Sequence, residues 1–174
     1  AMEDNAVNLL PPMANLDCQD LIRNGDLEES ADAYPYWLHH EAGIELLSGK
    51  GIDGSNAIAT TVHDGTMPYI GQFLDTRCLV AGRQYDVRAW VKLLDPKSNA
   101  VRSCDIGEDK GCPSIQLRIQ KSYGEEDVLS VASFFARPFK ANGWNLLQGT
   151  VTIDSRTESA VRVEFNVNRG EKGY

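Results

Sequence analysis

The stretch YDVRAWVKLL, residues 85–94, carries the pattern that decides the fold class. Apolar side chains occupy every second position from Tyr85 to Leu93, and polar or charged ones occupy most positions between them. A period of two is typical of a β-strand with one face toward a core and the other toward water. Trp90 is the exception, because its large ring stands in the polar row between two cations.

Two later stretches, residues 115–120 and 161–168, repeat this alternation. We therefore predict a single sheet that contains all three strands, with an apolar back and a front of hydrogen-bonding groups. Planar polar groups of this kind can form paired hydrogen bonds with a ligand, so we place the function on the front. Its predicted ligand-binding side chains are Arg88, Trp90, Gln116, Arg118, Gln120, Glu164, Asn166 and Asn168.

The rest of the chain is punctuated by turn residues that separate short apolar runs. No window sustains helical periodicity, so we predict an all-β chain folded as an antiparallel β-sandwich. A jelly roll is preferred over an immunoglobulin fold, because the cysteines fall in expected loops. A chain of 174 residues suits one domain, predicted over residues 16–174 after an N-terminal arm or linker at residues 1–15.

The chain has a formal net charge of −8. This charge disfavours nucleic acid and anionic membrane surfaces as partners. It also disfavours polyanionic glycans, unless a local row of arginines overrides it. Neutral ligands and divalent cations remain compatible. The apolar runs are too short to cross a bilayer, so we predict no membrane segment.

Four cysteines allow two disulfides. Cys104 and Cys112 bracket a short polar loop that a disulfide would close easily. Cys18 and Cys78 form the second bridge by elimination, although four cysteines allow three pairings. The alternative is four reduced thiols in a cytosolic protein; disulfides are preferred, because no cysteine spacing suggests zinc.

An ordered series of short motifs resembles the carbohydrate-binding modules of families 4, 9, 16 and 22. The motifs are NGDLE at 24–28, Trp37, GSNAI at 54–58, VAGRQY at 80–85, AWVK at 89–92 and WNLLQGTVTI at 144–153. These families share a galactose-binding-like jelly roll. The resemblance implies a non-catalytic module of a secreted or surface multidomain protein that binds a glycan chain.

The resemblance also implies a structural calcium ion near the NGDLE turn. Gly25, Glu28 and Ser55 are the positions that would approach the ion, since calcium is bound by several hard oxygens. Relatives complete this site with an Asp pair in a last strand, which would begin near Tyr174. The calcium prediction therefore stays open.

Aromatic faces are the second requirement for sugar binding. Tyr69, where relatives often carry tryptophan, is the predicted aromatic contact at the edge of the face. Trp90 is either a binding platform or a core residue, with the core preferred. The alternative for the whole front is a solvated face with cross-strand ion pairs such as Arg88 with Glu164.

We therefore expect a monomeric carbohydrate-binding module that takes a neutral glycan, within a secreted chain and without enzymatic activity. One alternative is a structural or adhesion ectodomain that makes protein contacts. Another is a small glycoside hydrolase or polysaccharide lyase, for which Glu164 would be an acid on the front row. No nucleophile or metalloprotease motif is present in the sequence.

Overall fold

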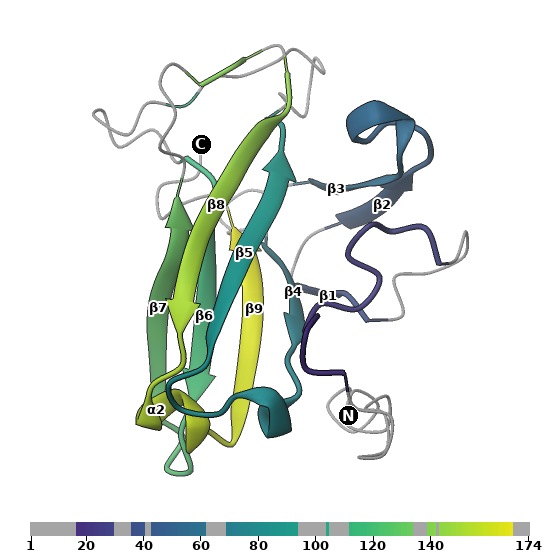
Figure 1. Cartoon of the computed structure of the whole chain (residues 1–174). Helices are drawn as coiled ribbons and strands as arrows, with labels where there is room; N and C mark the ends of the chain where they lie inside the picture. The colour runs from purple at the N-terminus through teal and green to yellow at the C-terminus, as the bar shows by residue number, and fades with distance from the viewer. Residues whose placement is uncertain are drawn as a thin grey trace.

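The computed structural model describes residues 17–29, 36–40, 43–61, 69–93, 104, 112–133, 139–141 and 143–168 (Figure 1). The predicted arm at residues 1–15 lies outside this part of the chain, so it stays a prediction. Within the described residues, no helix combines the length and the apolar character needed to span a membrane.

Short strands make up most of the described chain, as predicted. In order, the elements are β1 (Leu38–His40), β2 (Gly43–Leu47), η2 (Ile52–Gly54), β3 (Ala57–Thr61), β4 (Tyr69–Phe73), η3 (Thr76–Cys78), β5 (Gln84–Val91), β6 (Ser114–Gln120), β7 (Glu126–Ser133), β8 (Asn145–Thr152), α2 (Ser155–Glu158) and β9 (Arg162–Asn168). All strand pairs are antiparallel.

The strands form two layers and a separate hairpin (Figure 1). The larger sheet has five strands in the order β1-β4-β9-β6-β7, and β5 pairs with β8 in a second sheet. The hairpin consists of β2 and β3. Because neighbours in the large sheet are mostly not consecutive in sequence, connections cross between the layers.

The prediction that the strands at residues 85–94, 115–120 and 161–168 lie in one sheet is wrong. β5 pairs along its whole length with β8, from Gln84 opposite Thr152 to Val91 opposite Asn145. β6 and β9 instead pair with each other in the five-stranded sheet. Alternation shows which side chains of a strand face a core, but it carries no information about the pairing partner.

One apolar core lies between the two sheets. β6 and β9 contribute alternate side chains that are almost fully buried, and β5 presents its own apolar row to the same cluster. Full burial of one such apolar side chain contributes roughly 1.5–3 kcal/mol to the stability of the folded state. The buried members are Leu74, Leu79, Cys104, Ile115, Leu117, Ile119, Phe139, Leu147, Val151, Ile153, Val163 and Phe165.

The segment 17–29 is fastened to the sandwich before the first strand begins. The buried amide of Gln72 pairs with both backbone groups of Arg23, at 2.8 Å for each bond. Trp37 donates from its indole nitrogen to the carbonyl of Asn24 at 3.2 Å, and its ring packs edge-on against Phe165. Trp37 is therefore a packing residue, partly buried against the core.

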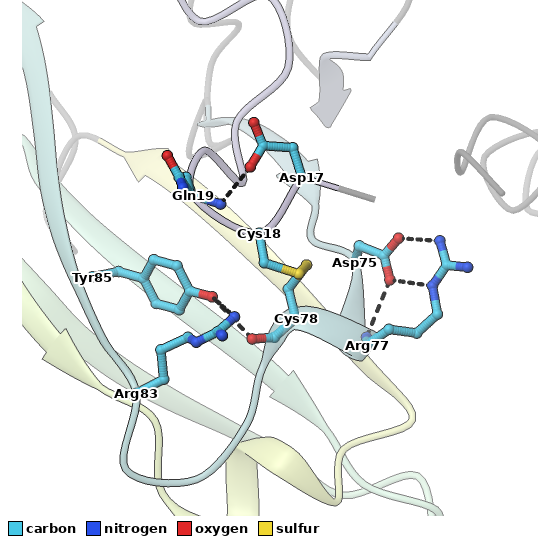
Figure 2. Close-up of a disulfide and its surroundings, with 8 residues drawn as sticks. All are labelled: Asp17, Cys18, Gln19, Asp75, Arg77, Cys78, Arg83 and Tyr85. Carbon is cyan, nitrogen blue, oxygen red and sulfur yellow. Dashed lines mark hydrogen bonds and ion pairs between the residues drawn. A yellow bond between two sulfur atoms is a disulfide. The ribbon is translucent and has the colours of Figure 1, made fainter. Parts of the chain in front are cut away.

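Both preferred disulfides are present, Cys18–Cys78 and Cys104–Cys112. Cys18–Cys78 joins the segment 17–29 to η3 (Figure 2). Tyr85 of β5 donates a hydrogen bond to the Cys78 carbonyl at 2.9 Å, which holds η3 against the edge of the second sheet.

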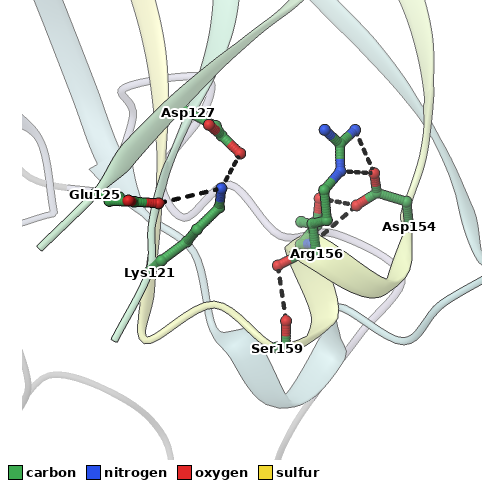
Figure 3. Close-up of polar contacts among 7 residues, drawn as sticks. Lys121, Glu125, Asp127, Asp154, Arg156 and Ser159 are labelled. Atoms are coloured by element: carbon green, nitrogen blue, oxygen red, sulfur yellow. Dashed lines mark hydrogen bonds and ion pairs between the residues drawn. The ribbon is translucent and has the colours of Figure 1, made fainter. Parts of the chain in front are cut away.

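The connection from β8 to β9 is a single helical turn, α2, with a strong N-terminal cap (Figure 3). The Asp154 carboxylate accepts hydrogen bonds of 2.8 Å from the backbone N–H and the hydroxyl of Thr157, which is buried. Arg156 folds back onto the same carboxylate at 2.7 Å. The Thr157 backbone bond, then Arg156, lower the pKa of Asp154 from 3.8 to about 2.

Removing this cap should make stability depend less on pH. A carboxyl group with a lowered folded pKa stabilises the fold above its unfolded value, and the gain is lost as the pH falls from about 4 to about 2. We expect Asp154→Ala to lower the free energy of unfolding by about 1 kcal/mol at pH 7. Asp154→Asn, which keeps an acceptor oxygen, should lose less. Urea denaturation at pH 7 and pH 2 measures both; an Ala deficit that persists undiminished at pH 2 contradicts this account.

Candidate functional site

The outward side of the five-stranded sheet carries a continuous set of polar side chains, which we call the front face. Its strands β4, β9, β6 and β7 run side by side, and registered residues share a face. One row joins Gly71, Asn166, Gln116 and Ser130, and the next joins Phe73, Glu164, Arg118 and Val128. A third row joins Arg162, Gln120 and Glu126.

Most predicted ligand-binding residues meet on this face. Gln116, Arg118 and Gln120 of β6 lie directly opposite the outward residues of β9. The backbones of Tyr69 and Asn168 pair with each other at the end of the same set. Their side chains lie outside the described residues, so their contribution to a site stays a prediction.

Arg88 and Trp90 do not join this set. They lie on β5, on the outer side of the second sheet, so the predicted shared row is wrong for them. The register partner of Glu164 on β6 is Arg118, and a cross-strand pair with Arg88 is therefore ruled out. Trp90 is 47% exposed, which also contradicts the preference for it as a core residue.

The centre of the front face is a buried amide above a glycine. Asn166 is 1% exposed, yet neither its amide nitrogen nor its amide oxygen has a hydrogen-bond partner among the described residues. Gly71, its register partner on β4, provides the space for it. A buried amide without hydrogen-bond partners lowers the stability of a fold by about 1–3 kcal/mol. Among the described residues, no hydrogen bond offsets this loss at Asn166.

Ionic and aromatic contacts hold the second and third rows of the front face in place. Arg118 donates to the Glu126 carboxylate of β7 at 2.8 Å, which fixes its planar guanidinium on the face. The Arg162 guanidinium lies 4.7 Å from the centre of the Phe73 ring. Sequence reasoning missed both Phe73 and Arg162, although Phe73 lies two residues after Gly71, a spacing that places both on one face of the strand.

The predicted calcium positions are only partly brought together. Glu28 reaches the GSNAI turn, where its carboxylate accepts hydrogen bonds from the Asn56 backbone at 2.7 Å and side chain at 3.2 Å. Ser55 instead donates to the Ile52 carbonyl at 2.7 Å. Gly25 lines a separate hollow of about 420 Å³.

Among the described residues, no group of three or more acidic, histidine or cysteine side chains could hold a metal ion. One carboxylate already bonded to N–H groups falls short of the six to eight oxygens that calcium takes. These residues as they stand do not fit the ion, and the calcium prediction stays untested.

A larger hollow, of about 720 Å³, lies away from the front face beside the Cys18–Cys78 disulfide (Figure 2). Asp17, Gln19 and Arg83 line it, together with Tyr85. It is wide open, and its charged groups are of both signs. We place the candidate site on the front face instead, because the planar polar groups converge there.

Substituting Gly71 tests the packing at the centre of the front face. An added Cβ would lie 2.6 Å from the Phe165 carbonyl oxygen and 3.0 Å from Asn166 Oδ1. We expect Gly71→Ala to lower the free energy of unfolding by about 1–3 kcal/mol, because backbone must shift. Urea denaturation measures the loss. Gly143→Ala is the control, since its nearest neighbour is the Lys140 Cβ at 3.9 Å; an equal loss in both variants would refute the close approach.

No protein-family model and no curated protein sequence matches the chain. Solved structures do match. The C-terminal family 22 carbohydrate-binding module of Clostridium thermocellum Xyn10B aligns with a TM-score of 0.63 and 15% identity, over 90% of this chain and 88% of that chain. The CBM22-2 xylan-binding domain of Paenibacillus barcinonensis Xyn10C aligns with a TM-score of 0.60 and 12% identity, over 81% of this chain and 80% of that chain.

A third match is the N-terminal endo-1,4-β-D-xylanase 10B of Clostridium thermocellum, whose CBM22-1 and GH10 modules were solved with xylohexaose. Its TM-score is 0.56 at 11% identity, over 77% of this chain and 23% of that chain. At such identities the likeness establishes the fold alone. The predicted jelly roll is confirmed: the chain has the galactose-binding-like β-sandwich fold seen in family 22 carbohydrate-binding modules.

Proposed function

We propose that the chain is a non-catalytic carbohydrate-binding module that holds a neutral glycan on its front face. The observation that carries the proposal is the gathering of planar amide and guanidinium groups on one face. Gln116, Gln120 and Asn166 come from neighbouring strands in matched register. Amides donate and accept at once, which suits the paired hydroxyl groups of a sugar.

The fold supports this choice of ligand. One of the named relatives is described as a xylan-binding domain and another was solved with xylohexaose, so xylan is the first neutral glycan to test on this chain. The aromatic component would come from the β4 side of the face, where Phe73 lies and Tyr69 begins the strand. Aromatic faces stack on the apolar CH face of a pyranose ring.

A binding role is favoured over catalysis by the state of the acids on the front face. Glycosidases use two carboxylates on either side of the scissile bond. Glu126 is held in a salt bridge with Arg118 at 2.6 Å, so it is a poor second acid for Glu164. Incubation with xylan tests this directly, because a hydrolase or lyase would release reducing ends or unsaturated products.

The same proposal places the module in an oxidising compartment as part of a longer secreted chain. Two disulfides support that location, since such bridges rarely persist in the cytosol. The xylanase match, in which a similar module is joined to another domain, supports the multidomain context.

Replacing Asn166 by leucine separates binding from folding. The amide has no hydrogen bond to lose within the described chain, so we expect unfolding free energy to stay the same or rise. Affinity for soluble xylan should fall at least about tenfold, or about 1.4 kcal/mol, in affinity electrophoresis. Gln84→Ala, on the exposed side of the other sheet, should leave retardation unchanged. Unchanged xylan binding by Asn166→Leu, or no binding by the parent chain across neutral glycans, would overturn the proposal.

Calcium at the NGDLE turn remains a separate proposal, because the described residues there do not by themselves complete a site for the ion. An ion there needs more oxygen ligands than Glu28 provides, and it would displace the Asn56 N–H groups. If it binds, melting temperature should be several degrees higher in millimolar calcium than in chelator, because only the folded state binds it. Glu28→Gln should abolish that difference. Identical melting curves in calcium and chelator would remove the ion from the proposal.

A further inference from the structure

The outer side of the β5–β8 sheet carries an aromatic group between two cations. We propose that this surface is a second binding site, separate from the front face, that takes a glycan bearing uronic acids. It consists of Arg88, Trp90 and Lys92 with Gln148 of β8, and we call it the basic-aromatic patch.

Register and exposure place the members together. Arg88 and Trp90 are two residues apart on the outward side of β5, and Lys92 follows two residues on. Gln148 lies opposite Arg88. Outward positions on a strand repeat about every 7 Å, so Arg88 stands one such step from the indole. Lys92 is exposed and directly follows Val91, the last residue of β5. All four residues are exposed, and Trp90 is 47% exposed.

Within the described residues, neither cation of the patch has an ion-pair partner. Among the described arginines, the others stack on an aromatic ring or bond to an acid or a phenol, as Arg77 does to Asp75 and Arg156 to Asp154. Arg88 has no such contact within the described chain. The nearest acid on the same strand row, Asp86, accepts a hydrogen bond from Thr150 at 3.0 Å.

These features favour a ligand that combines an anionic group with a flat apolar face. The protein carries a net charge of −8, so two cations that flank one indole form a local exception to its field. An exposed indole adds a flat apolar surface of the kind that stacks on the CH face of a pyranose. A uronic acid offers both features in one residue, a carboxylate and a CH face. A guanidinium such as that of Arg88 can bind this carboxylate through two parallel hydrogen bonds.

The patch and the front face belong to different sheets, so one ligand chain cannot use both through neighbouring strands. The inference therefore goes beyond the proposed function and does not depend on it. If both hold, one module has two sites of different charge preference, and two weak sites on one molecule raise the overall avidity for mixed polysaccharides.

Affinity electrophoresis in polygalacturonate, with the methyl-esterified polymer as the uncharged match, tests the patch in 0.15 M salt. We expect the parent chain to be retarded by the acid form and not by the ester. Trp90→Ala and Arg88→Ala should each weaken retardation at least about fivefold. Because both side chains are exposed, melting temperature should change little. Gln84→Ala, two residues before Asp86 on the same outer row, is the matched control and should bind like the parent.

Three results would overturn the patch. The parent chain fails to bind the acid polymer, or it binds the ester equally well. Alternatively, poly-glutamate retards it as strongly and Trp90→Ala has no effect, which indicates an acidic polypeptide held by charge alone. Asn166→Leu distinguishes the two proposals: it should lose xylan and keep polygalacturonate, and loss of both would place the acid polymer on the front face.

Discussion

Burial of one apolar face from each sheet is the constraint on which the rest of this structure depends. β6 and β9 present alternate side chains to the core, and β5 and β8 close it from the other side. With the inward positions committed to packing, every second residue is left outward and free to vary in chemistry. The two surfaces proposed for binding are therefore both products of strand alternation, and they face away from each other because the core separates them.

Close packing and an ion pair position the polar groups of the front face. Gly71 permits the approach of Asn166, and the Arg118–Glu126 pair joins β6 to the edge strand β7. Among the described residues, the Asn166 side chain has no hydrogen-bond partner. Natural proteins commonly depart from full polar satisfaction at functional positions, which is the role we propose for this residue.

The sequence predicted those features of the fold that depend on residues close together in the chain. Alternation identified β5, β6 and β9, and loop composition identified the Cys104–Cys112 bridge. The grouping of strands into sheets was beyond it, because pairing depends on contacts between distant residues. That is why Arg88 and Trp90 were assigned to the wrong face while the β6 and β9 residues were assigned to the right one.

The Cys18–Cys78 bridge has a mechanical consequence. It encloses β1 to β4 in a covalent loop with a sequence separation of 60 residues. If force is applied to the two ends of the chain, the tension passes through the sulfur atoms and leaves that loop slack. The length released on forced opening is then shorter by up to about 200 Å, the span of 60 extended residues. A chain pulled at both ends would thus keep β1 to β4, four of the nine described strands, unloaded.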